Sequence, residues 1–359
     1  MGIKDLKTLI RKHSPNGIAT RNLSHYANKT VAIDTSIYFY RFLAYGNHLS
    51  GFVRQILLLL ENGITPLYIF DGKPPDEKYE VINERKIKKE KSLALKEQIE
   101  KKLDITDDPN EIKMLQKQLF DINRKLIWVS PEHISSAKEL FRLFGVPYLD
   151  ADGEAEILCA KMCQRGLVQA CLSEDTDLLP NGACIFINNF KVSYKYIQEF
   201  NLGNILKDMG LTMEQFVDLC ILCGCDYTCK IEGLAKDGAY TMIKKYVNIE
   251  GIINYIKYYN KKTGKQKYIV PENFNYQRAR EIFCTPMEEL VDPGLIVTKL
   301  KPIHSDSLKN FVEMNCDRLA KRYHTQVKKL CQNKTITKIS YINQFSSKTI
   351  DSYFAPIKS

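Results

Sequence analysis

The segment VQACLSEDTD (168–177) joins a short apolar run to three acidic residues. An apolar run of this length, followed by polar residues, is typical of a strand inside a sheet. If the strand continues through Asp175 and Asp177, these two side chains point to the same face and Glu174 points away, because side chains alternate along a strand. The segment therefore predicts a functional pair of aspartates and one bystander at the carboxyl end of a strand.

Three other segments have the same form, a β-branched or aromatic run that ends at an aspartate. They are 29–34, 65–71 and 146–150. Patterns typical of helices lie between them, at 51–62, 135–144 and 154–165. Alternating strands and helices predict an α/β fold, with a mostly parallel central sheet and helices on both faces. Ligands bind at the carboxyl ends of strands in such folds, and the aspartates lie there.

A charged helical region, 84–127, interrupts this alternation. Apolar residues recur in it with the 3-4 spacing of a narrow coiled-coil seam, at Leu95, Ile99, Leu103, Ile112, Leu115, Leu119, Ile122 and Leu126. A turn at 106–109 ends in a proline that suits the start of a second helix. We therefore predict an inserted helical hairpin. Its first helix is basic (Arg85, Lys86, Lys88, Lys89, Lys91), which indicates either a solvated face or a basic arm over the acidic site.

Composition limits the classes of function. The 359 residues carry a net charge of +10, which favours a nucleic acid or another acidic partner, although solubility alone could explain it. We expect no membrane span and no signal segment. The eleven cysteines lack a secreted framework and are expected to be reduced. Cys220, Cys223, Cys225 and Cys229 favour a buried helix over a zinc site, because no second CxxC pair or nearby histidine completes the ligands.

Acidic residues at strand ends and in first helical turns form a candidate metal site. Each alone is most often a cap or turn residue, but together at one edge they would repel one another by several kcal/mol without cations. Carboxylate oxygens are the ligands that Mg²⁺ and Mn²⁺ prefer. Two such ions can activate a water molecule and stabilise the leaving oxygen of a phosphodiester. The acids are Asp34, Asp71, Asp152, Glu154, Glu156, Asp175, Asp177 and Asp226.

Motifs along nearly the whole chain resemble the flap endonuclease (XPG-type) family. They are MGIKDL (1–6), VAID (31–34), IFDGKPP (69–75), PYLDA (147–151), GEAE (153–156), EDTD (174–177), LCGCDY (222–227) and VPENF (270–274). The resemblance implies a PIN-like fold and a Mg²⁺-dependent, structure-specific 5′-flap endonuclease and 5′-exonuclease of DNA replication and repair. The alternatives are an exonuclease or junction-resolving relative and a non-catalytic DNA-binding relative.

The resemblance also implies residue roles. The family's ligands for two Mg²⁺ ions, with Mn²⁺ as a substitute, fall on Asp34, Asp71, Glu154, Glu156, Asp175, Asp177 and Asp226. Its catalytic lysine and arginine match Lys78 and Arg85, and its base-stacking tyrosine matches Tyr40, which could instead serve helix packing. A monovalent cation would lie in the turn at 230–235. DNA contacts are further predicted for Lys230, Gly233, Lys236, Lys244 and Lys245.

Two departures from the family pattern change the expected substrate. The link 43–52 is shorter than in the cellular enzymes, which argues against recognition of a one-nucleotide 3′ flap. The turn GLAKDG (233–238) lacks one glycine, the proline and the basic pair of the family's hairpin motif. Both favour a divergent member, such as a viral replication enzyme, that acts inside the cell in the nucleus or in a viral replication compartment.

We predict five parts in the chain. The nuclease core comprises 1–76 and 133–228, the helical gateway 77–132, a C-terminal helical DNA-binding region 229–344, and a flexible tail 345–359. In the tail, Ile350, Tyr353 and Phe354 resemble the aromatic end of a sliding-clamp-binding peptide, with Ser347 in place of the usual glutamine. The expected partners of a monomeric chain are branched DNA, with 5′ flaps, nicks or gaps, and the clamp.

Overall fold

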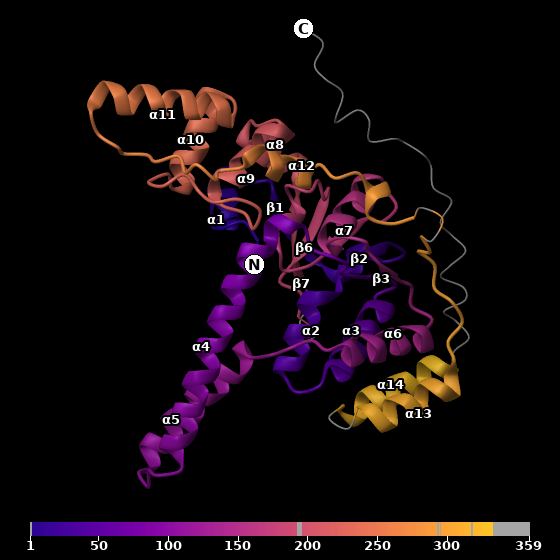
Figure 1. Ribbon diagram of the computed structural model, residues 1–359. Coiled ribbons are helices and arrows are strands. Elements are labelled where there is room, and N and C mark those ends of the chain that lie inside the picture. The colour runs from indigo at the N-terminus through magenta and orange to yellow at the C-terminus, as the bar shows by residue number, and fades with distance from the viewer. Residues whose placement is uncertain (1, 192–195, 293, 295, 317–318, 333–359) are drawn as a thin grey trace.

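The computed structural model describes residues 2–191, 196–292, 294, 296–316 and 319–332 (Figure 1). Their strands form one sheet in the order β1-β7-β6-β5-β2-β3-β4. The strands are β1 Ile18–Asn22, β2 Thr30–Asp34, β3 Thr65–Phe70, β4 Tyr148–Asp150, β5 Ala170–Leu172, β6 Ile185–Asn188 and β7 Tyr196–Asn201. From β6 to β4 the neighbours are parallel, whereas β7 is antiparallel to β6 and to β1. The predicted mostly parallel sheet is confirmed, and β1, β6 and β7 were not predicted.

Helices cover both faces of the sheet, as predicted. Along β2, Ala32 belongs to one hydrophobic core while Val31 and Ile33 belong to the other, because side chains alternate along a strand. The helices of the first core include α1 Leu6–His13, α7 Ala155–Gln164, α8 Leu202–Met209 and α9 Met213–Cys223. The helices of the second include α2 Thr35–Ala44, α3 His48–Glu61 and α6 Pro131–Phe144. This arrangement brings the carboxyl ends of β2, β3 and β5 to one edge.

A helical hairpin, called the arch below, projects from the core (Figure 1). It consists of α4 Tyr79–Leu103 and α5 Pro109–Lys125, and the short 3₁₀ helix η2 Asp76–Lys78 leads into it. Ile99, Leu115 and Ile122 bury its seam in a hydrophobic cluster separate from the two cores. The arch is therefore a self-supported hairpin, as its apolar spacing predicted.

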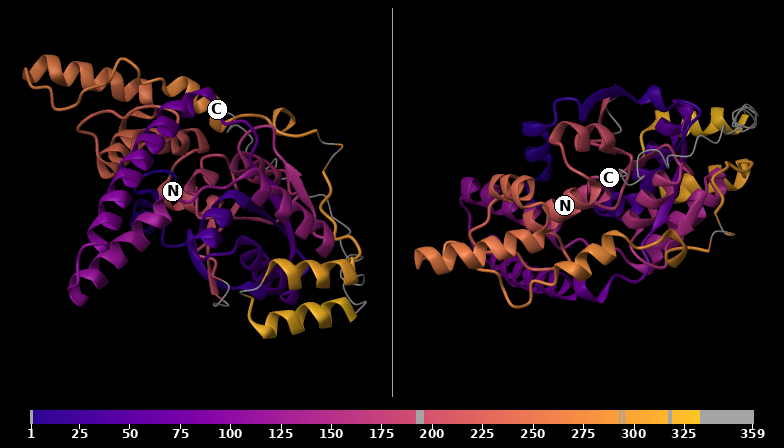
Figure 2. Two further views of the ribbon diagram at one scale, coloured as in Figure 1. Left: turned by 60° about the horizontal axis from the view of Figure 1, so that its bottom comes forward. Right: turned by 90° about the horizontal axis from the view of Figure 1, so that it is seen from above.

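The remaining helices lie in two places. α10 Lys236–Tyr246 and α11 Ile249–Thr263 form a second projection. Residues 240–270 of this projection are called the arm below. α12 Tyr276–Phe283 packs on α9. α13 Ser305–Asn315 and α14 Lys321–Gln332 instead pack on α6 and α3 (Figures 1 and 2). The described helices within the predicted region 229–344 thus lie on two sides of the core. Further 3₁₀ turns are η1 Leu23–Tyr26, η3 Thr176–Leu178 and η4 Met287–Glu289.

In the described part of the chain, no helix has both the length and the apolar character needed to cross a membrane.

Candidate active site

The acids predicted from widely separated segments meet in one cleft of about 500 Å³. Its lining includes Asp34, Asp71, Glu154, Glu156, Asp175 and Asp226. The seventh predicted ligand, Asp177, is only 2% exposed and lies close enough to Asp175 and Asp226 for their charges to raise its pKa. The parallel sheet therefore brings the predicted carboxylates together at its carboxyl edge, whereas Asp152 is absent from the lining of the cleft.

The predicted strand geometry of EDTD was wrong. β5 ends at Leu172, and Asp175 is the N-cap of η3. The carboxylate of Asp175 accepts a hydrogen bond from the backbone N–H of Asp177 at 3.1 Å, so a tight turn rather than strand alternation brings the two acids together. The closeness of Asp175 and Asp177 was predicted correctly, but the physical reason given for it, alternation along a strand, was wrong.

Glu174 has a separate set of partners. Its carboxylate forms an ion pair with Arg41 at 2.8 Å and accepts a hydrogen bond from the side-chain amide of Asn188 at 2.9 Å. These partners lie outside the acidic cluster, so Glu174 is held apart from the other acids, and its role as a bystander stays a prediction.

Hydroxyl and backbone donors orient the first two carboxylates. Asp34 accepts hydrogen bonds from the backbone N–H of Ser36 at 3.2 Å and from the hydroxyl of Ser173 at 2.9 Å. Asp71 accepts from the backbone N–H of Ala155 at 2.8 Å and from the hydroxyl of Ser36. Sequence reasoning missed both serines. Ser36 follows Asp34 by two residues, the spacing of a helix cap, and that spacing is the signal that could have identified it.

Two further contacts shape the acidic cluster. The phenol of Tyr227 donates a hydrogen bond to Glu154 at 2.7 Å. Gly2 has a φ of +83°, and a Cβ atom there would lie 2.0 Å from a carboxylate oxygen of Asp175. Only glycine fits this close approach, which explains the position of Gly2 in the N-terminal motif.

Burial and mutual repulsion make the acids costly to ionise. Burial, followed by the charge of Asp71, raises the pKa of Asp34 above its ordinary range. Burial, followed by the charge of Asp175, likewise raises the pKa values of Glu156 and Asp177. One oxygen of Glu156 and one of Asp177 are buried without a hydrogen-bond partner. Such atoms need a cation or a proton.

Cations of the arch partly meet this need. The ammonium of Lys78 contacts Glu154, lies 3.9 Å from Glu156 and 3.8 Å from Asp226, and Arg85 bonds Asp226 at 2.7 Å. Burial alone would lower the pKa of Lys78, but the charges of Glu156 and Glu154 raise it above the ordinary value. Both predicted cationic residues therefore face the acids, Lys78 from the end of η2 and Arg85 from the first half of α4.

The donor chemistry fits hard divalent cations. The acidic cluster presents carboxylate oxygens, the ligands that such cations prefer. One oxygen of Glu156 and one of Asp177 have no hydrogen-bond partner and could therefore bind a cation. As the side chains stand, no three histidine, cysteine or acidic side chains of the described residues are spaced to share a metal ion. Lys78 and Arg85 lie between the acids in this arrangement.

The other predicted site residues differ in their surroundings. Tyr40 is 48% exposed and lines the cleft. The ammonium of Lys236 lies 3.8 Å from Asp5. That of Lys244 donates hydrogen bonds to the backbone oxygens of Met209 and Gly210, at the end of α8. Lys244 thus has a structural partner already.

The turn at 230–235 packs against the end of the arm. Gly233 has a φ of +77°, and a Cβ atom there would lie 2.3 Å from the backbone oxygen of Lys267. Lys230 lies beside Gly224, and Lys245 lies over the ring of Tyr246. The clamp-binding residues predicted at Ile350, Tyr353 and Phe354 lie outside the described residues.

Three of the four cysteines for which a buried helix was favoured over a zinc site have ordinary packing partners. Cys220 and Cys223 are buried in α9, and the thiol of Cys229 donates to the side-chain oxygen of Asn273 at 3.2 Å.

Comparison with protein families matches two family descriptions. Residues 1–92 match the XPG N-terminal domain, and residues 145–226 match the XPG I-region. The break between the two matches contains most of the arch. Flap endonuclease 1 of Drosophila mojavensis is 37% identical over 330 residues, which cover 87% of this chain and 80% of that protein.

Comparison with solved structures shows the same fold. The catalytic core of Rad2 in complex with a DNA substrate superposes with a TM-score of 0.69 at 23% identity, covering 92% of this chain and 99% of that one. The junction-resolving enzyme GEN1, in complex with product DNA and Mg²⁺, has a TM-score of 0.61 at 19% identity, with 92% and 78% covered. The predicted PIN-like α/β fold is confirmed.

Proposed function

Because this chain belongs to the flap endonuclease family, we propose that its acidic cleft hydrolyses DNA phosphodiesters at the base of 5′ flaps, with 5′-exonuclease activity at nicks and gaps. The single observation that carries the proposal is the meeting of seven acids from the core with two cations from the arch. A basic protein around an acidic cleft suits a polyanionic substrate that is cut by metal-assisted hydrolysis.

We assign two Mg²⁺ ions to the cleft, with Mn²⁺ as a substitute. Asp34, Asp71, Glu154, Glu156, Asp175, Asp177 and Asp226 would hold them. Bound there, the ions would supply an activated water molecule and stabilise the leaving oxygen.

The chain's own residues orient this machinery. Ser36 and Ser173 hold the carboxylate of Asp34 through hydrogen bonds, and Tyr227 holds that of Glu154. Lys78 and Arg85 would transfer their contacts from the acids to the phosphate oxygens of the substrate, where they stabilise the charge that develops during cleavage. Tyr40, exposed at the side of the cleft, would stack on the unpaired base next to the cut.

The short link between α2 and α3 bears on the choice of substrate. α2 ends at Ala44 and α3 begins at His48, and the side-chain amide of Asn47 donates to the backbone oxygen of Asn315 at 3.0 Å. This link is tied to the end of α13, so we propose that a 3′ flap adds little to binding. The DNA contacts of Lys230, Gly233, Lys236, Lys244 and Lys245, and a monovalent cation at 230–235, are part of the proposal.

The proposed setting follows from the substrate. We propose that this enzyme acts inside the cell, in the nucleus or in a viral replication compartment. We further propose that it acts as a monomer and that its tail binds a sliding clamp.

Cleavage of labelled DNA tests the proposal. The substrates are single 5′ flaps, double flaps, gaps, nicks and four-way junctions, each with Mg²⁺ or with a chelator, and each with the wild type or Asp175→Asn. We expect Mg²⁺-dependent cutting near the base of the 5′ flap, equal rates for single and double flaps, and no cutting by Asp175→Asn. Preferred cutting of four-way junctions would instead identify a junction-resolving enzyme, and DNA binding without cutting of any substrate would identify a non-catalytic relative.

A further inference from the structure

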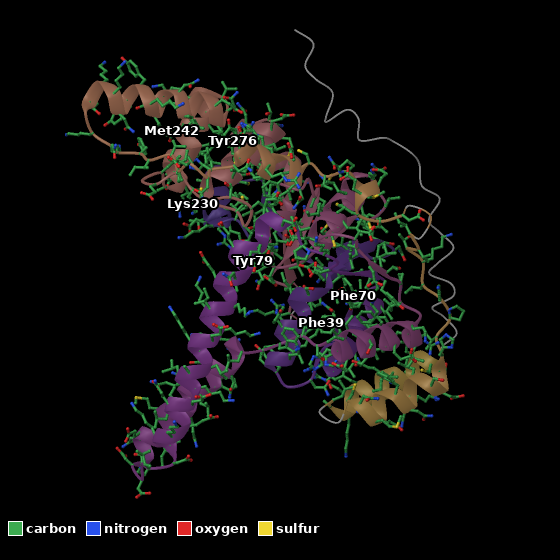
Figure 3. All side chains as sticks on the ribbon, viewed as in Figure 1. Phe39, Phe70, Tyr79, Lys230, Met242 and Tyr276 are labelled. Atoms are coloured by element: carbon green, nitrogen blue, oxygen red, sulfur yellow. The ribbon has the colours of Figure 1, made fainter. Side chains whose placement is uncertain are left out.

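A second pocket, of about 540 Å³, lies apart from the acidic cleft. Its walls come from α7, α9, α12, the turn after η3 and the junction of α10 with α11, and it shares no lining residue with the cleft. Figure 3 shows Tyr276, where α12 begins, well separated from Phe39 and Phe70, which line the cleft. The volume of the second pocket is typical of small-molecule sites, and the proposed function makes no use of it.

A buried lysine supplies a positive charge to the second pocket. Lys161 is 9% exposed, and its ammonium donates a hydrogen bond to the backbone oxygen of Phe283 at 2.9 Å. An ammonium has three N–H donors, so two remain. Burial lowers the pKa of Lys161, and no carboxylate offsets this effect. Because buried charges are normally paired, the ammonium lacks an anionic partner.

A buried amide adds an unpaired acceptor to the same pocket. Asn181 is fully buried, and its side-chain amide donates a hydrogen bond to the backbone oxygen of Asp177 at 2.8 Å. This bond fixes the orientation of the side chain, because the nitrogen has to face Asp177. The opposite atom, Oδ1, has no hydrogen-bond partner among the described residues. A buried acceptor of this kind is costly unless a donor reaches it.

The backbone beside the second pocket is strained. Val247, which lines it, has a φ of +73° and a ψ of −45°, and the backbone N–H of Asn248 donates to the backbone oxygen of Tyr246 at 2.9 Å. These angles and this bond define the rare, strained form of the γ-turn, which a β-branched residue seldom adopts. Strained backbone is concentrated at ligand sites, so the turn is a third feature that indicates a ligand.

These features define the chemistry of the ligand. Lys161 requires an anionic group, and Asn181 requires a hydrogen-bond donor. Met213, Val217 and Phe283 line the same pocket and offer an apolar surface to the rest of the molecule. A nucleoside monophosphate has all three parts, since it carries a phosphate, donor groups on its base and sugar, and a flat apolar ring system.

The charges of the walls limit the anion to one phosphate. Arg280 bonds Asp218 at 2.5 Å and Glu250 at 2.7 Å, so its charge is already used. Glu214 lines the pocket but is exposed, and water screens its charge. Lys161 is therefore the one lining cation without an acidic partner, and the acids would repel a chain of several phosphates.

We propose that the second pocket binds a nucleoside monophosphate, with its phosphate at Lys161, a donor group at Oδ1 of Asn181 and its base against the apolar wall. The choice of ligand rests on the proposed function, because 5′-exonuclease activity releases nucleoside monophosphates. The pocket would hold such a product away from the acidic cleft.

Calorimetric titration of the whole protein with deoxyadenosine monophosphate (dAMP) tests the site. A chelator is present, so that no divalent ion holds the phosphate in the acidic cleft. Deoxyadenosine, inorganic phosphate and dATP are titrated in parallel. Lys161→Met removes the charge at similar side-chain length. The matched control is Lys7→Met, because Lys7 is another partly buried lysine, bonded to Asn188 at 2.9 Å and absent from the lining of the pocket. Melting curves verify that each variant is folded.

We expect dAMP to bind the wild type, with a Kd about tenfold or more higher in Lys161→Met, because a charge-assisted hydrogen bond is lost. Lys7→Met should keep the wild-type Kd. Deoxyadenosine and inorganic phosphate should each bind about tenfold or more weakly than dAMP, since each lacks one of the contacts. The additional phosphates of dATP should weaken binding through repulsion by the acids.

A second measurement needs no substitution. Cys284 is exposed and lines the second pocket, whereas Cys331 of α14 lies outside it. Alkylation of both thiols by iodoacetamide is followed by peptide mass spectrometry, with and without dAMP. Alkylation of Cys284 should slow in proportion to occupancy of the pocket, and that of Cys331 should keep its rate.

Four outcomes would overturn the proposal. They are no binding of dAMP to the wild type, equal binding by Lys161→Met, an unchanged alkylation rate of Cys284 at saturating dAMP, and inorganic phosphate binding as tightly as dAMP. Because binding is measured without cleavage, failure of this proposal is distinct from failure of the proposed nuclease function, which would appear as no cutting of DNA by the wild type.

Discussion

The arch and the arm are both helical hairpins that project from one side of the core, but they carry charge differently. α4 of the arch contains eight basic and five acidic residues, whereas the arm contains seven lysines and one glutamate. The arch has its own apolar seam and brings two cations to the acids, and the arm has a ladder of tyrosine rings, in which Tyr246 stacks on Tyr255, under exposed lysines. Under the proposed function, the arch would act on the reacting phosphate and the arm would contact distant ones.

The largest expected effect concerns the cleft that both hairpins serve. Asp177→Asn should lower kcat on a 5′ flap by a factor on the order of 10³, because it removes a charged ligand from the cation site. The Kd for DNA, measured with a chelator, should change by less than about threefold, since the arm and the remaining lysines still bind phosphates. Loss of DNA binding in this variant would contradict the division between catalysis and binding.

The second effect isolates the base of the arch. Lys78→Ala should lower kcat by about 10²-fold with little change in KM, because Lys78 contacts acids at the reacting centre. Steady-state kinetics on one flap substrate measure both constants. The control is Lys88→Ala, whose side chain is 73% exposed and pairs with Glu84 on the same helix, and this variant should stay near wild-type rates.

The third effect concerns the seam of the arch. Leu115→Ala and Ile122→Ala each remove a buried side chain and should weaken the seam locally by about 2 to 5 kcal/mol. Because this cluster is separate from the two cores, the melting temperature should change little, while cleavage by an added protease within residues 84–127 should increase. A large fall in melting temperature would show that the arch and the core unfold as one unit.

The smallest effect tests the bystander acid. Glu174→Gln weakens a partly exposed ion pair with Arg41, a change of about 0.2 to 1 kcal/mol in the free energy of unfolding. The cleavage rate of Glu174→Gln should remain within about threefold of the wild-type rate. Asp177→Asn, measured in the same assay, should show its much larger loss. A loss as large as that of Asp177→Asn would contradict the assignment of Glu174 outside the acidic cluster.

The sequence predicted the parts of this site that follow from periodicity. Apolar runs that end in acids predicted the carboxyl edge of β2, β3 and β5 and the meeting of their carboxylates. The turn at Asp175 was mistaken for a continuation of the strand, because the apolar run does not show that β5 already ends at Leu172. Strands β1, β6 and β7 were missed because none of them leads into an acidic residue, the feature by which the other four strands were recognised.

Tertiary contacts could not be predicted in the same way. The hydrogen bond from Ser173 to Asp34 joins residues 139 positions apart, and the reach of Arg85 to Asp226 depends on how the arch meets the core. The single-signed charge of residues 240–270 is visible in the sequence, but the ladder that orders it is not. Lys78 and Arg85 were identified by family resemblance, since a lysine and an arginine in a charged helix have no distinctive pattern.

The most direct test of the account compares kcat and KM for two variants on the same 5′-flap DNA, with the junction and both duplex limbs held constant. Lys78→Ala should lower kcat and leave KM nearly unchanged. The arm variant Lys257→Gln/Lys261→Gln/Lys262→Gln/Lys265→Gln should raise KM about tenfold or more and leave kcat unchanged. A fall in kcat for the arm variant, or a change confined to KM for Lys78→Ala, would contradict the separation of the two hairpins into a catalytic and a duplex-binding element.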